Sequence, residues 1–262
     1  MACRLRRYVR RHSGPIRVGA AATVADSKRA FHAAFPHVIS PLHRRMVDEL
    51  LVELHLLKHQ QGFQADALFS VGLVQVFDAF SRGYRPDRLR EPLFSALCQA
   101  TGFEAAMIRE RSGAALSAMG EHSLEAVRSW VEQRGAGAPQ PLADALGAIQ
   151  RPDFHYSRLM AVGLLTLLEK AHGADTLDPQ ALRQAAHEIG ESMGMMKDRL
   201  DKDLGLYAGN LEKMAQAVEL MEETVAAERR RRERRAVSGA AEVVPAADAG
   251  GSAEAPAVDP SA

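Results

Sequence analysis

Hydrophobic residues recur at helical spacing along most of this chain. After Ser40 and Pro41, which have the residue types of an N-cap and a first helical position, leucines and a valine mark one face of a helix over 41–60. The stretches 65–81 and 154–172 are apolar round most of their circumference, which is typical of helices at the centre of a bundle. Shorter helices are expected over 90–101, 104–118, 123–134 and 179–191.

The longest regular pattern lies in the last third of the chain. Apolar residues recur there in two seven-residue series offset by three, which predicts a coiled-coil-type helix over 195–235. This heptad seam consists of Leu200, Leu204, Tyr207, Leu211, Met214, Val218, Met221 and Val225. The pattern fits packing on the chain's own domain and packing against a second chain equally well. Alternating β-branched runs, the pattern of strands, are not found, so the sequence predicts an all-α fold: a helical bundle with a long C-terminal coiled-coil-like helix.

The heptad helix ends in a run of basic residues that forms a candidate interaction surface: Arg229, Arg230, Arg231, Arg232, Arg234 and Arg235. A leucine-zipper protein would carry its basic region before the zipper, and single-strand binders interleave aromatic side chains, so a nucleic-acid partner is not expected. Two interpretations stay open. The run is either a solvated helix end favoured by the helix dipole, or a surface for an acidic protein or an anionic lipid.

Charge and composition divide the chain into four parts. Residues 1–23 form a basic arm that is expected to be disordered, and it is a native segment, a targeting segment or an upstream extension. Residues 24–194 form the bundle domain, residues 195–235 the heptad helix, and residues 236–262 a disordered tail of alanine, proline and acids. Because the apolar runs are shorter than the roughly 18 residues that span a bilayer, any membrane association is expected to be peripheral.

The sequence offers little for catalysis or metal binding. His55 and His59 have the four-residue spacing of a helical metal pair, but neither a third ligand nor an intervening glutamate accompanies them. Cys98 fits a small core residue better than a reactive thiol, and Cys3 lies in the arm. The motifs therefore predict a non-enzymatic protein with no catalytic residues, cofactor, metal or small-molecule substrate.

Three pairs of segments resemble the thylakoid formation family, the photosystem II biogenesis factors of cyanobacteria and plastids. They are 23–31 with 41–57, 68–80 with 93–103, and 154–169 with 203–215, and they include Pro41-Leu-His-Arg-Arg45 and Phe154-His-Tyr-Ser157. The collinear match covers about 23–235, whereas 104–150 match loosely and the arm and tail fall outside it.

The resemblance implies an all-helical, non-enzymatic factor in thylakoid biogenesis and photosystem II assembly or repair. It implies association with an FtsH-type membrane protease and a place on the cytoplasmic side of the thylakoid membrane in a cyanobacterium, or in a plastid if the arm is a transit peptide. A rival interpretation is a peripheral membrane-shaping protein that binds anionic thylakoid lipid through the C-terminal basic helix.

Overall fold

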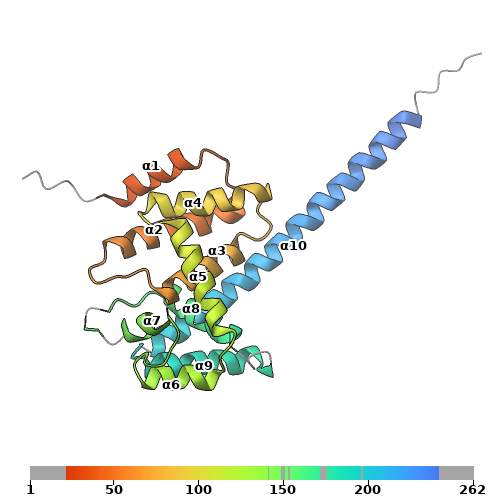
Figure 1. Ribbon diagram of the computed structural model, residues 1–262. Helices are drawn as coiled ribbons and strands as arrows, with labels where there is room; N and C mark the ends of the chain where they lie inside the picture. Colours follow the sequence, from red (N-terminus) through yellow and green to blue (C-terminus); the bar gives the residue numbers. More distant parts are fainter. Residues whose placement is uncertain are drawn as a thin grey trace, which may run out of the picture. The chain divides into compact units, whose positions relative to one another are not determined.

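A computed structural model describes residues 22–140, 142–148, 151–152, 154–171, 176–195 and 197–241. These residues form ten α-helices and one 3-10 helix and contain no strand, which confirms the all-α prediction (Figure 1). The helices are α1 (Val24–Ala34), α2 (Pro41–His59), α3 (Ala67–Phe80), η1 (Asp87–Leu89), α4 (Arg90–Ala100), α5 (Ala105–Met119), α6 (Leu124–Glu132), α7 (Leu142–Ala148), α8 (Arg158–Lys170), α9 (Pro179–Ser192) and α10 (Lys197–Ala241). Most of the expected arm and the tail from residue 242 lie outside the described residues.

Two helices were not predicted from the sequence. α7 is a short helix between loops, too short for a periodic signal. α1 begins with a capping box: the Thr23 side chain accepts from the Asp26 amide while the Asp26 carboxylate accepts from the Thr23 amide at 2.8 Å. This local signal was available in the sequence, next to the boundary of the expected arm. α10 begins two residues later and ends six residues later than the range expected for the heptad helix.

Pro41 and Pro179 lie at the first positions of α2 and α9, where the sequence predicted that helices begin. At α9 the Asp178 carboxylate caps the helix by accepting from two amides, those of Gln180 at 2.7 Å and Ala181 at 2.9 Å. At α2 the N-cap residue is Ser40, as expected, but its side chain makes no capping bond to the helix backbone. The Ser40 hydroxyl instead pairs with Nδ1 of the buried His43 at 2.7 Å.

α3 and α8 cross at the centre of the domain, as their nearly all-apolar circumference predicted, and their backbones meet at two glycines. A Cβ atom placed on Gly72 would lie 1.7 Å from the carbonyl oxygen of Leu159, and one on Gly163 would lie 1.9 Å from that of Leu68. Such distances are far inside van der Waals contact, so only glycine permits this approach. The remaining core is built around this crossing and contains Leu54, Phe69 and Phe77 at full burial.

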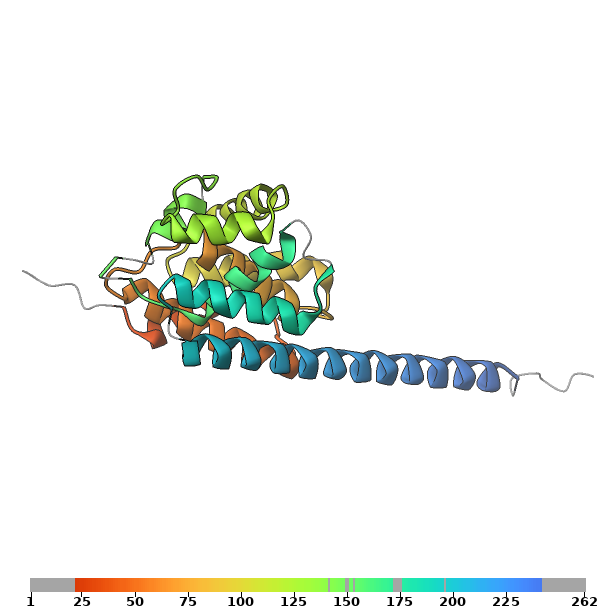
Figure 2. The same cartoon turned by 90° about the horizontal axis from the view of Figure 1, so that it is seen from below.

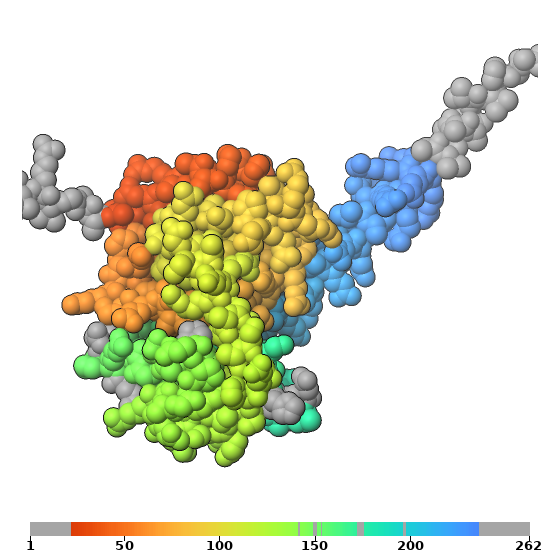
Figure 3. Space-filling view, in the orientation of Figure 1, coloured from red at the N-terminus to blue at the C-terminus, as the bar shows by residue number. Residues whose placement is uncertain are grey.

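The smaller helices lie at opposite ends of this central pair. α1, α2 and α4 pack together at one end, and α6, α7 and α9 pack together at the other (Figures 1 and 2). α5 packs on both α3 and α8, and in the space-filling view it runs across the face between the two ends (Figure 3). The chain divides into two units, Met1–Met214 and Ala215–Ala262, and α10 contributes residues to both.

Candidate interaction surfaces

The first part of α10 belongs to the core of the helical domain. Leu200 and Leu204 are buried at 0% and 3% exposure, and Met214 is 8% exposed. Leu200 reaches α9 where Gly190 leaves room, because a Cβ on that glycine would lie 2.5 Å from a Leu200 methyl group. The glycines around Gly190 are too sparse in the sequence for phosphate binding, and the structure gives this residue a packing role.

The other seam residues are covered to different extents. Tyr207 is partly buried, with its ring 6.1 Å from that of Phe80 in an edge-on contact, and burial is the main cause of the raised pKa of its hydroxyl. Leu211, Val218 and Met221 are partly exposed. Val225 is 64% exposed. The structure thus places the first seam residues in the core and leaves the last one open to solvent.

A groove of about 320 Å³ lies within the helical domain, bordered by α2, α3, α8 and the first part of α10. Its apolar lining includes Leu50, Val162 and Met214, and Leu206 stands at its edge with 54% exposure. Concave, mainly apolar sites with a few polar groups are the usual form of binding sites. The sequence gives no sign of this groove, since its lining comes from four helices far apart in the chain.

Polar side chains at this groove are already paired with one another. The Glu53 carboxylate forms an ion pair with Arg158 at 2.7 Å, and the Tyr156 hydroxyl donates to the Asp203 carboxylate at 2.8 Å. Burial raises the pKa of Glu53, opposed by Arg158, and the nearby negative charge of Asp203 raises it further. Burial and the bond to Asp203 likewise raise the pKa of Tyr156. The first pair joins α2 to α8, and the second joins the segment before α8 to α10; neither sets a nucleophile beside a base.

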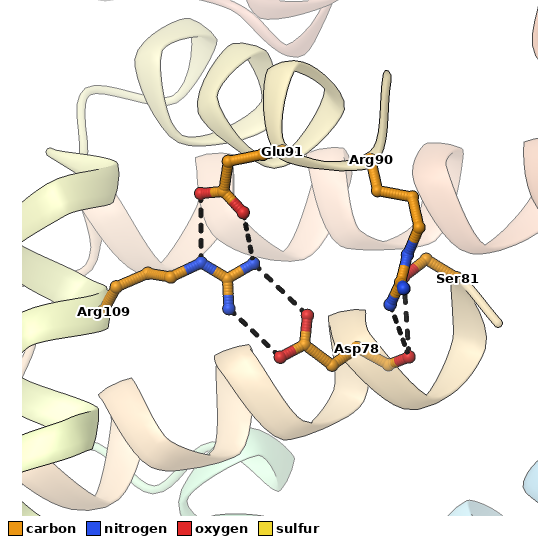
Figure 4. Close-up of polar contacts among 5 residues, drawn as sticks. All are labelled: Asp78, Ser81, Arg90, Glu91 and Arg109. Atoms are coloured by element: carbon orange, nitrogen blue, oxygen red, sulfur yellow. Dashed lines mark hydrogen bonds and ion pairs between the residues drawn. The ribbon is translucent and has the colours of Figure 1, made fainter. Parts of the chain in front are cut away.

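A second polar cluster joins α3, α4 and α5 (Figure 4). The Arg109 guanidinium donates to both oxygens of Asp78, at 3.0 and 3.2 Å, and to both oxygens of Glu91, at 3.0 and 2.9 Å. It also stacks over the Phe94 ring, 4.3 Å from the centroid. Arg90 donates to the Ser81 hydroxyl beside it. Arginine with two carboxylates is a strong structural arrangement, but it contains no base that is free to act on a substrate.

The histidine pair from the sequence is engaged in packing. Nδ1 of His55 lies 2.9 Å from the Ser27 hydroxyl of α1, and Nδ1 of His59 donates to the His55 carbonyl oxygen at 2.8 Å. In the described part of the chain, no group of three His, Cys, Asp or Glu side chains is placed to hold a metal ion. Cys98 is fully buried, as expected of a core residue, and burial raises the pKa of its thiol to about 12. Cys3 lies outside the described residues.

All six arginines of the basic helix end are exposed. Two of them form ion pairs with glutamates one turn away along the helix, Arg229 with Glu233 at 2.9 Å and Arg232 with Glu228 at 3.5 Å. The other four, Arg230, Arg231, Arg234 and Arg235, form no ion pair with any residue that the structure describes. The helices that the structure describes include none with the length and apolar character needed to cross a bilayer.

These features define an all-helical protein with a partly apolar groove and an exposed basic helix end. Residues 23–236 match the family model described as thylakoid formation protein. "Protein Thf1" of Prochlorococcus marinus (strain MIT 9313) is 55% identical over 213 residues, covering 81% of this chain and 88% of that protein. "Protein Thf1" of Synechococcus sp. (strain CC9605) is 50% identical over 221 residues, covering 83% of this chain and 95% of that protein.

A solved structure of Psb29 superposes with a TM-score of 0.71 at 33% identity, covering 81% of this chain and 99% of that one. The chain therefore belongs to the thylakoid formation protein family, as the resemblance of its sequence segments predicted.

Proposed function

We propose that this chain is a non-enzymatic accessory factor in thylakoid membrane biogenesis and in photosystem II assembly or repair. It acts by associating with an FtsH-type membrane protease at the cytoplasmic side of the thylakoid membrane. The observation that carries the proposal is the family match over residues 23–236, together with relatives from cyanobacteria that are 55% and 50% identical.

The chemistry of the domain supports a binding role. Its partly buried carboxylates and arginines are used in pairs that link helices, such as Glu53 with Arg158 and Asp78 with Arg109. The groove beside α10 offers an apolar surface to a protein partner, with Leu206 exposed at its edge. An exposed leucine next to a partly apolar groove enlarges the apolar surface that another protein can cover.

Affinity capture tests this proposal. The tagged protein is incubated with detergent-solubilised cyanobacterial thylakoids, and mass spectrometry quantifies the protease and photosystem II subunits that are retained. We expect both to be enriched over a tagged control protein. A Leu206→Glu variant should lose most of this enrichment. Met107→Glu is the matched control, because Met107 is 52% exposed on α5 and does not line the groove.

The three outcomes have different meanings. Loss in Leu206→Glu alone supports the groove as the contact surface. Equal enrichment in both variants would show that the partner contacts a different surface of the protein. If the wild-type protein retains neither the protease nor photosystem II subunits, and a strain that lacks it recovers normally from strong light, the proposed function is wrong.

A further inference from the structure

The basic end of α10 has two chemically different faces. With about 100° of rotation per residue, Arg230, Arg231, Arg234 and Arg235 lie within one arc of about 140°. Glu228, Arg229, Arg232 and Glu233 fill the opposite arc, where both ion pairs are formed. One face is therefore neutralised by its own glutamates, whereas the other presents four exposed guanidinium groups that form no ion pair with a described residue. We call these four residues the free-arginine face.

The neutralised face continues the apolar repeat. Val218, Met221 and Val225 lie on the same side of the helix as the ion-paired residues, since they follow the seven-residue spacing that leads to Glu228 and Arg232. The free-arginine face lies on the opposite side of the helix. That side also holds Leu220, which is 65% exposed and precedes Arg230 by ten residues, or about 15 Å of helix.

We propose that the free-arginine face binds an anionic membrane surface, with the helix end lying flat on the lipid headgroups. A plane meets one arc of a helix at a time, and this arc brings four positive charges to the plane together. Guanidinium groups bind phosphate oxygens in a bidentate manner, and the long arginine stems rest on the apolar boundary while their charged ends stay hydrated. An exposed leucine on the same side is compatible with the interfacial layer.

The composition of this stretch favours a membrane over a protein or a nucleic acid. Residues 215–235 contain no aromatic side chain, so they lack both the stacking groups of single-strand binders and the aromatic anchors typical of protein hot spots. Each arginine near an anionic leaflet contributes an attraction that adds to the others and falls off within the screening length. The membrane contact is independent of the proposed protease association.

Acidic residues that precede Arg230 on the same helix determine where the basic surface begins. Glu219 and Glu223 lie at its edge on the preceding turns, and Glu223 is about 10 Å along the helix from Arg230. That distance is close to the screening length at physiological salt. The basic surface therefore begins at Arg230, and Glu223→Gln should strengthen binding a little.

The experiment compares two double variants of the full-length protein. Arg231→Gln with Arg234→Gln removes two charges from the free-arginine face. Arg229→Gln with Arg232→Gln removes two charges from the ion-paired face, with the same three-residue spacing and the same change in net charge. Binding is measured by co-sedimentation with vesicles of phosphatidylglycerol in phosphatidylcholine, with pure phosphatidylcholine vesicles as the neutral control. The basic N-terminal residues are common to all proteins compared.

We expect the first double variant to bind anionic vesicles about 10- to 30-fold more weakly than the wild type, from roughly two lost arginine contacts. The second should lose about threefold or less, and all three proteins should bind neutral vesicles poorly. Equal losses in both variants would mean that net charge alone matters, which overturns the face assignment, and no loss in either overturns the membrane contact. Unchanged vesicle binding with lost binding to polyglutamate would assign the face to an acidic protein instead.

Discussion

The apolar repeat of α10 passes through two regions that cover it differently. In the unit that ends at Met214, Leu200 and Leu204 are buried, at 0% and 3% exposure. In the unit that starts at Ala215, Val225 continues the same repeat and is 64% exposed. A heptad pattern therefore shows where a helix has an apolar side, but it does not show how much of that side another surface covers.

The two regions also use charge differently. In the helical domain, partly buried groups such as Glu53 and Arg158 join helices that are distant in the sequence. Beyond Ala215, the described ion pairs link residues four apart on one helix, as in Arg229 with Glu233. Pairs of the first kind support tertiary structure, whereas exposed pairs of the second kind contribute only a few tenths of a kcal/mol to the helix.

The largest expected effect comes from the helix crossing at the centre of the domain. Gly163→Ala should destabilise the fold by about 3 kcal/mol or more, because the new methyl group meets a backbone carbonyl that cannot move aside. Gly205→Ala in α10 is the matched control: a Cβ placed there would have nothing within 4 Å, so the substitution should stabilise the helix by about 0.5–1 kcal/mol. Urea unfolding followed by circular dichroism measures both, and similar stability of the two variants would contradict the close crossing.

The next effect separates the two regions of the seam directly. Leu204→Ala should cost about 2–5 kcal/mol, as expected for a buried leucine, and Leu211→Ala should cost less because that side chain is partly exposed. Val225→Ala should stay within about 0.5 kcal/mol of the wild type. A large loss of thermal stability in Val225→Ala would show that a second surface covers this end of the seam. Concentration-dependent sedimentation would then identify a second chain.

A smaller effect is expected from the buried His43, which should make the folding stability depend on pH. Its Nε2 donates to the Arg82 carbonyl at 3.0 Å, and its pKa is lowered from 6.5, mainly because burial disfavours the charged ring. Below pH 6.5 the unfolded chain takes up the proton before the folded chain does, so His43 makes folding stability decrease as the pH falls.

Urea unfolding at about pH 7 and about pH 5 tests this effect. His43→Asn should be less stable at neutral pH, but it should lose less stability on acidification than the wild type. An equal loss in both proteins would show that the ring does not contribute to the acid sensitivity.

The smallest effect is expected at the basic helix end. Arg229→Gln with Arg232→Gln removes both described ion pairs of this stretch, and it should change the unfolding free energy by less than about 1 kcal/mol. The same double variant is the control for vesicle binding, so its stability also checks that comparison. A marked fall in the melting temperature would show that Arg229 and Arg232 make stabilising contacts in addition to their ion pairs with Glu233 and Glu228.

Much of the helical architecture could be predicted from local signals. The apolar circumference of 65–81 and of 154–172 identified the central helices, because a helix without a polar side can be stable only in a core. Proline after Ser40 and after Asp178 marked two helix starts, since proline fits the first helical position. α7 was missed because a helix of seven residues is too short for an amphipathic period to appear.

The sequence by itself determined the all-α class, the central helix pair, the long heptad helix and the position of its basic end. Only the tertiary structure decided that Gly72 and Gly163 lie at a backbone crossing, that Leu200 is buried while Val225 is exposed, and that four helices enclose a groove. It also decided that Glu53 of α2 pairs with Arg158 of α8. The physical reason is that periodicity and capping act over a few residues, whereas burial and ion pairing depend on surfaces brought together from distant parts of the chain.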